Sequence, residues 1–185
     1  MTEKLNLIDV YSDAKESFYN KKENLNQKSR HWKIYDFREF NFENLKNFRS
    51  NGKLSEGLDD QNESFSFKVF ANIINDISED YLINNLPKKN IGNSDNLIKY
   101  KDVFIDYNKL IHIYWFWTVE KEILTKNNIQ SVCEIGGGFG SFAELFIKNH
   151  NMKLLSIDLP EANLMTSYYL KEDFTEKNFF LFDSY

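Results

Sequence analysis

The sequence VCEIGGGFGS, residues 132–141, decides the fold class of this chain. Four of the seven glycines lie within five consecutive positions of it: Gly136, Gly137, Gly138 and Gly140. An apolar run from Ile129 to Ile135 precedes them, which is typical of a buried parallel strand. Glycines after such a strand permit positive φ angles and let the backbone approach a ligand closely. The stretch therefore predicts a strand followed by a ligand-binding loop, residues 136–140, which we call the glycine loop.

The residues after the glycine loop continue an alternation of helices and strands. Ser141 and Glu144 have the spacing of a capping box, which predicts a helix from there to about residues 149–151. Residues 153–158 form a second predicted strand, and Pro160 fits the first turn of a second helix. Residues 179–182 form a third predicted strand. The order strand, helix, strand, helix, strand is the first half of a Rossmann-like, doubly wound α/β sheet.

A mostly helical N-terminal region, residues 1–125, is expected before this partial ligand-binding domain of residues 126–185. Residues 1–60 carry aromatic anchors among short helices and turns. Apolar residues at helical spacing predict one helix over about 64–85 and a longer one over about 101–126. In the longer helix Tyr114, Trp115 and Trp117 cannot all face one core. One of them is therefore expected to be available to a ligand or a partner chain.

Two classes of cofactor bind at a glycine-rich loop of this type. The spacing E/D-x-G-x-G-x-G, found in S-adenosylmethionine sites, is met in full by Glu134, Gly136, Gly138 and Gly140. The dinucleotide spacing would have to use Gly136, Gly138 and Ser141, which is an imperfect match.

Electrostatics favours the methyl donor. The carboxylate of Glu134 would repel a pyrophosphate, whereas S-adenosylmethionine carries an ammonium and a sulfonium. Asp158, at the end of the next strand, can accept hydrogen bonds from both ribose hydroxyls. An NAD(P)-dependent sugar-modifying enzyme and a non-enzymatic remnant are the alternatives.

The glycine motif and the segment LLSIDLPEANLMTSYYL, residues 154–170, together resemble the bacterial sugar O-methyltransferase family of class I methyltransferases. The resemblance covers roughly residues 125–182. It implies transfer of a methyl group from S-adenosylmethionine to a sugar hydroxyl. It also implies that the glycine loop, with Gly137 inside it, and Glu134 hold the donor, and that Asp158 holds the ribose.

The resemblance implies a sheet of seven strands, of which this chain supplies three. The first strand is then expected to lie at an open edge of the sheet, which invites pairing with another chain. We expect these residues alone to bind the donor weakly and not to turn over. A homo-oligomer and a second chain that supplies the missing strands both stay open as partners.

No catalytic base emerges from the sequence. His31 and His112 are the candidates, and Asp59 and Asp60 could instead hydrogen-bond sugar hydroxyls or hold a divalent ion. A packing or surface role is favoured for His112, a loop position for His31, and solvated turn positions for Asp59 and Asp60. Asp183 follows the third strand, where an adenine-contacting loop would lie. His150 is expected at a helix C-terminus, and Cys133 is expected to be a small core residue.

Composition excludes several other classes of protein. The 185 residues carry a formal net charge of −5, which disfavours a nucleic-acid partner held through phosphates. A single cysteine cannot form an intramolecular disulfide, and no pair of cysteines has metal-binding spacing. The N-terminus lacks the apolar segment of a signal peptide, and no apolar run could span a membrane. A soluble, cytoplasmic protein is expected.

Overall fold

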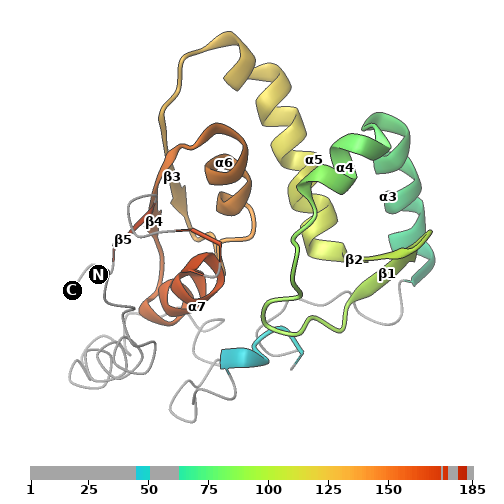
Figure 1. Cartoon of the computed structure of the whole chain (residues 1–185), viewed down its shortest axis with the longest axis horizontal. Coiled ribbons are helices and arrows are strands. Elements are labelled where there is room, and N and C mark those ends of the chain that lie inside the picture. Colours follow the sequence, from blue (N-terminus) through green and yellow to red (C-terminus); the bar gives the residue numbers. More distant parts are fainter. Residues whose placement is uncertain (1–44, 51–62, 172, 175–178, 183–185) are drawn as a thin grey trace.

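The computed structural model describes residues 45–50, 63–171, 173–174 and 179–182 (Figure 1). The described part is mixed α/β, with helices and two small sheets. The candidate residues His31, Asp59, Asp60 and Asp183, and the features expected within residues 1–44, lie outside it. The elements in chain order are α3 (Glu63–Asp76), α4 (Glu79–Asn85), β1 (Leu97–Tyr100), β2 (Val103–Asp106), α5 (Tyr107–Glu122), the short 3₁₀ helix η5 (Leu124–Lys126), β3 (Ser131–Ile135), α6 (Ala143–His150), β4 (Lys153–Ile157), α7 (Pro160–Lys171) and β5 (Phe179–Phe182).

The second sheet has three parallel strands in the order β3-β4-β5. Sequence patterning predicts the three strands and α6 to within about two residues at each end, and it predicts the start of α7 at Pro160. Among the described strands β3 lies at an edge of the sheet, as expected for the first strand. Asn151 ends α6 in the left-handed conformation, at φ 50°, and its N–H bonds the Ile147 carbonyl.

Both helices pack on the same face of this sheet. The row Val132, Leu154 and Phe179 faces them, since these residues are partners in the register of the three strands. Ala143 and Ile147 of α6 belong to the same apolar cluster, as do three residues of α7: Met165, Tyr169 and Leu170. The crossover helices of a parallel sheet supply this cover.

The opposite face of the sheet is exposed. Cys133, Leu155 and Phe180 are register partners on that face, and Phe180 is 57% exposed. Ile135, on the same face of β3, is 79% exposed. The expectation that Cys133 is a core residue is therefore wrong, because the helices that the structure describes cover its strand on one side only. We call these four residues the open face.

Two predictions for the N-terminal region are wrong. The helix expected over 64–85 is two helices, because Ser78 caps a new start by accepting from the Tyr81 N–H at 3.2 Å. The helix expected from Lys101 begins only at Tyr107, where Asp106 is its N-cap. Residues before it form the antiparallel hairpin of β1 and β2, which turns at Lys101 with φ 51°.

Helix α5 connects the two parts of the described chain. In Figure 1 it stands between the group of α3, α4, β1 and β2 and the parallel sheet with α6. Its residues Leu110, Ile113 and Phe116 are fully buried in a cluster that also contains Leu145 and Phe146 of α6. Within the described ranges no helix has the length and apolarity that crossing a bilayer requires.

The open face predicts that Cys133 reacts in the native protein. Maleimide labelling without denaturant is expected to modify it at a rate within about tenfold of the unfolded protein, because the side chain is exposed. Mass spectrometry of the intact chain measures this rate. A thiol that reacts only in denaturant would show that something covers the open face.

Candidate functional site

The glycine loop joins the end of β3 to α6 and is shaped by positive φ angles. Gly136, Gly138 and Gly140 have φ of 72°, 66° and 84°, in the left-handed region that only glycine adopts without strain. A side chain placed at Gly136 or Gly138 would meet no atom within 4 Å. The backbone there borders open space, as a loop that receives a ligand must.

Asp158, directly after β4, holds the glycine loop from the next strand. One of its carboxylate oxygens accepts from the Gly138 N–H at 2.9 Å, and the other accepts from the Leu159 N–H at 2.7 Å. Thr166 of α7 donates its hydroxyl to the Gly138 carbonyl at 2.8 Å. Both backbone groups of Gly138 are thus engaged within the protein. Each oxygen of Asp158 keeps a lone pair with which to accept from a ligand.

Glu134, near the end of β3, lies against the same loop. A Cβ on Gly137 would come within 2.1 Å of its carboxylate. The Oε2 atom of Glu134 is buried and accepts no hydrogen bond from the residues that the structure describes. Burial raises the pKa of Glu134 to about 7, and the nearby charge of Asp158 adds to the shift. Burial also raises the pKa of Asp158, against its two backbone hydrogen bonds.

These two acids form a partly buried, electronegative pair at the tips of neighbouring parallel strands. A buried carboxylate without a partner is costly, and a cationic ligand beside it removes that cost. A pyrophosphate would instead be repelled by both acids. The Gly138 N–H, which could serve an anion, is already bound to Asp158. The residues predicted to bind a cofactor (Glu134, Gly136, Gly137, Gly138, Gly140 and Asp158) are therefore brought together, in an arrangement suited to a cation.

The predicted capping box at Ser141 and Glu144 is wrong. Helix α6 starts at Ala143, and its N-cap residue, Phe142, makes no side-chain hydrogen bond. Glu144 turns inward instead, forming an ion pair with Lys109 of α5 and accepting from the Tyr169 hydroxyl at 2.6 Å.

Sequence reasoning missed this cluster altogether. Lys109 has only 1% of its surface exposed, and its ammonium also donates to the Ser141 carbonyl at 2.8 Å. Its position in the sequence could have indicated that Lys109 is buried. It lies four residues before Ile113 and seven before Phe116, on the apolar side of the helix.

A second buried cation approaches the glycine loop. Arg49 pairs with Asp106 at 2.5 Å and donates to the Ile91 carbonyl at 3.1 Å. Its guanidinium lies 4.8 Å from the ring centre of Phe139, the aromatic residue inside the glycine loop. Asp106 is also the N-cap of α5, where it accepts from the Lys109 N–H at 2.8 Å.

Beside the start of α6, α5 presents a group of aromatic rings. The ring of His112 packs against those of Trp115 and Phe142, with centroids 5.6 Å and 5.9 Å away. Burial lowers the pKa of His112 to about 4, and the charges of Lys109 and Arg49 contribute. His112 is therefore neutral at pH 7 and too weak a base to be favoured as a proton acceptor.

Trp115 is the aromatic residue of this helix that stays open, at 53% exposure, whereas Trp117 and Tyr114 stack on each other at 5.8 Å. This agrees with the expectation that the three rings cannot share one core. His150 ends α6 as predicted and pairs with Glu120 at 2.7 Å.

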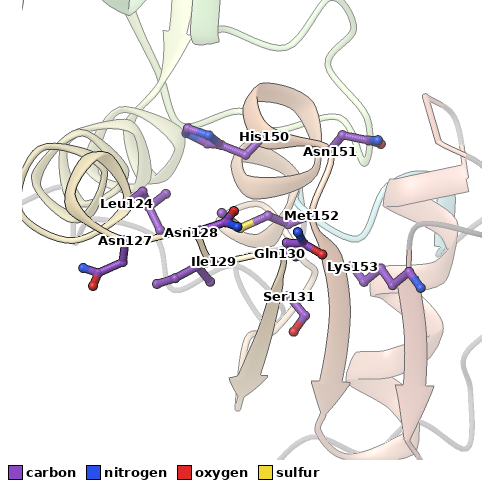
Figure 2. Close-up of a pocket in the computed structure, with 10 residues that line it drawn as sticks. All are labelled: Leu124, Asn127, Asn128, Ile129, Gln130, Ser131, His150, Asn151, Met152 and Lys153. Carbon is purple, nitrogen blue, oxygen red and sulfur yellow. The ribbon is translucent and has the colours of Figure 1, made fainter.

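A pocket of about 730 Å³ lies elsewhere on the molecule. Figure 2 shows its lining side chains on the segment before β3 and on the turn between α6 and β4. Ser131 and Lys153, the first residues of β3 and β4, belong to it. It therefore borders the amino ends of the strands, whereas the glycine loop follows the carboxyl end of β3. In parallel α/β sheets cofactors bind at the carboxyl ends, so this pocket is not the candidate cofactor site. Across the described ranges no three metal-binding side chains come together.

No family model matches the chain, and no curated protein or solved structure shows significant similarity to it. A function is therefore proposed from the residues, their geometry and the resemblance of their motifs.

The raised pKa of Glu134 predicts that Glu134→Gln stabilises the protein in the absence of ligand. A carboxyl group whose pKa is higher in the folded state contributes stability below its unfolded value, near 4.5, and loses it as the pH rises through about 7. The free energy of unfolding of the variant should therefore exceed that of the natural protein by on the order of 3 kcal/mol at pH 8. The difference should vanish below pH 4.5. Urea unfolding across this pH range measures it. Equal stabilities at pH 8 would contradict a buried, unpartnered carboxyl.

Gly137→Ala is predicted to displace the carboxylate of Glu134 while leaving the fold intact. Gly137 is not among the residues with positive φ, so alanine brings no left-handed backbone strain there, and the clash falls on the Glu134 side chain from Cγ to the carboxylate. The expected change in unfolding free energy is below about 1 kcal/mol. A crystal structure of the variant shows whether the carboxylate moves.

Gly136→Ala is the matched control, because at φ 72° it strains the backbone without touching Glu134. An unmoved carboxylate in Gly137→Ala would refute the described packing.

Proposed function

We propose that this chain binds S-adenosylmethionine at the glycine loop and belongs to an S-adenosylmethionine-dependent methyltransferase acting on a sugar hydroxyl. The observation that carries the proposal is the pair of Glu134 and Asp158 beside a glycine loop whose backbone borders open space. The three-stranded parallel sheet with both crossover helices on one face supports a Rossmann-like domain.

The residues present fit the donor. The unpartnered oxygen of Glu134 suits the ammonium of its amino-acid part. The oxygens of Asp158 suit the ribose hydroxyls, since each can accept one more hydrogen bond. When bound, S-adenosylmethionine supplies a methyl group on a positively charged sulfur. The chain's own residues hold the nucleoside and balance its charge.

The sugar acceptor comes from the family resemblance of residues 154–170 and the glycine motif. One observation is compatible with it. Trp115 is half exposed and contacts Phe142, which lies two residues beyond the glycine loop, at a centroid distance of 6.2 Å. An exposed indole can stack on the apolar face of a sugar ring. No base for the hydroxyl proton is assigned.

Three ligands in calorimetric titration test the donor site: S-adenosylhomocysteine, adenosine and NAD. Adenosine shares the ribose and base of the donor but lacks the ammonium. Glu134→Gln should therefore lower the affinity for S-adenosylhomocysteine by about 10- to 100-fold, which corresponds to one charge-assisted hydrogen bond. It should leave the affinity for adenosine unchanged. Asp158→Ala should lower the affinity for both ligands. NAD binding that survives or improves in Glu134→Gln, with no binding of S-adenosylhomocysteine, would overturn the proposal in favour of a dinucleotide enzyme.

The same titration has an expected pH dependence. Only the ionised form of Glu134 attracts the ammonium, and its pKa lies at about 7. Affinity for S-adenosylhomocysteine should accordingly rise about tenfold from pH 6 to pH 8. The Glu134→Gln variant is the control and should lose this rise.

A further inference from the structure

Lys109 is a fully buried lysine that links the helical part of the chain to the glycine loop. Lys109 lies on α5, in the helical region, and its ammonium contacts the first residues after Gly140. There it donates to the Ser141 carbonyl at 2.8 Å and forms an ion pair with Glu144. Lys109, Ser141 and Glu144 have 1%, 1% and 4% of their surfaces exposed.

Helix α7 also contacts the glycine loop. Tyr169 donates its hydroxyl to Glu144 at 2.6 Å, and burial raises its pKa, which keeps it a donor. One turn earlier Thr166 bonds the Gly138 carbonyl, and its methyl group lies where a side chain on Gly140 would go. Contacts from α5 therefore hold the residue that follows the loop, and contacts from α7 hold Gly138 within it.

A buried ion pair is a poor way to gain stability. Removing two charges from water costs as much as their attraction returns, and apolar residues of similar volume often serve the fold equally well. What an apolar residue at position 109 could not provide is the hydrogen bond to the Ser141 carbonyl. That bond fixes the peptide group one residue beyond Gly140, whose φ of 84° sets the exit of the glycine loop.

We propose that Lys109 is a positioning residue that holds the glycine loop in the conformation in which it receives a cationic nucleoside. The proposal rests on the proposed function for the identity of the ligand, but not for the effect on the loop. Arg49 strengthens the same link, because it lies over Phe139 of the loop and pairs with Asp106 at the start of α5.

The test replaces the whole polar cluster, so that no charge is left buried without its partner. The triple variant Lys109→Met, Glu144→Met, Tyr169→Phe keeps similar volumes and is expected to fold. Two hydrogen bonds report on the loop: Gly138 N–H to Asp158, and Gly140 N–H to the Gly137 carbonyl. Hydrogen exchange of these two amides by NMR should accelerate at least tenfold in the variant, whereas the amides of β4 should not change.

The same variant should bind S-adenosylhomocysteine at least tenfold more weakly than the natural chain. Lys101→Met is the control, because it removes the exposed ion pair with Glu79 far from the loop and should change neither measurement. If the triple variant does not fold, Lys109→Gln with Glu144→Gln serves instead. The two introduced amides can pair with each other, but the shorter side chain at position 109 no longer reaches the Ser141 carbonyl.

Folded variants with unchanged loop exchange and unchanged affinity would overturn the role of Lys109. Failure of the natural chain to bind S-adenosylhomocysteine would overturn the proposed function instead. The exchange of the Gly138 and Gly140 amides would then still decide whether Lys109 positions the loop.

Discussion

The contact between Lys109 and Glu144 is the constraint that fixes how α5 and α6 meet. It joins α5 to α6 through the interior, where each charge is excluded from water. A buried charge must have its partner within reach, so the two helices can pack in only a narrow range of positions. The apolar cluster around Phe116 and Phe146 also packs α5 against α6, but apolar contacts alone allow several relative positions of the two helices. The ion pair removes that freedom.

The glycine loop adds a second constraint of the opposite kind. Its backbone is permissive in isolation, because Gly136, Gly138 and Gly140 lose more entropy on folding than any other residue would. The structure compensates by bonding both polar groups of Gly138 to fixed side chains on neighbouring elements. Glu134 is left as a polar group that the described part of the fold does not satisfy. A buried polar group without a partner, beside a loop that borders open space, is a place where a ligand can supply the partner.

Sequence patterning predicts the parallel part of the fold well, because its signals are local. The glycines after β3, Pro160 at the start of α7 and the apolar runs of the strands each act within a few residues. The candidate cofactor-binding residues Glu134 and Asp158 can be identified for the same reason, since a strand ends just before the glycine loop and just before Asp158.

The failures concern residues whose partners are distant in the chain. Glu144 has the spacing of a capping residue, but its partner Lys109 is 35 positions away, and no local pattern reveals that contact. Periodicity predicts helix over β2, because a short strand next to a helix shares its apolar content. The prediction of a buried Cys133 fails because a parallel strand is ordinarily covered on both faces, and β3 is not.

The position of Cys133 has a practical consequence. It is the single cysteine of the chain, and its register partner Leu155 lies between it and Phe180, at the centre of the open face. A fluorophore or spin label attached there would sit at one defined point on the sheet, without any engineering of the sequence. Its emission or mobility would change when any further polypeptide settles over the three strands. A label on Cys133 would thus report the binding of a polypeptide to the open face.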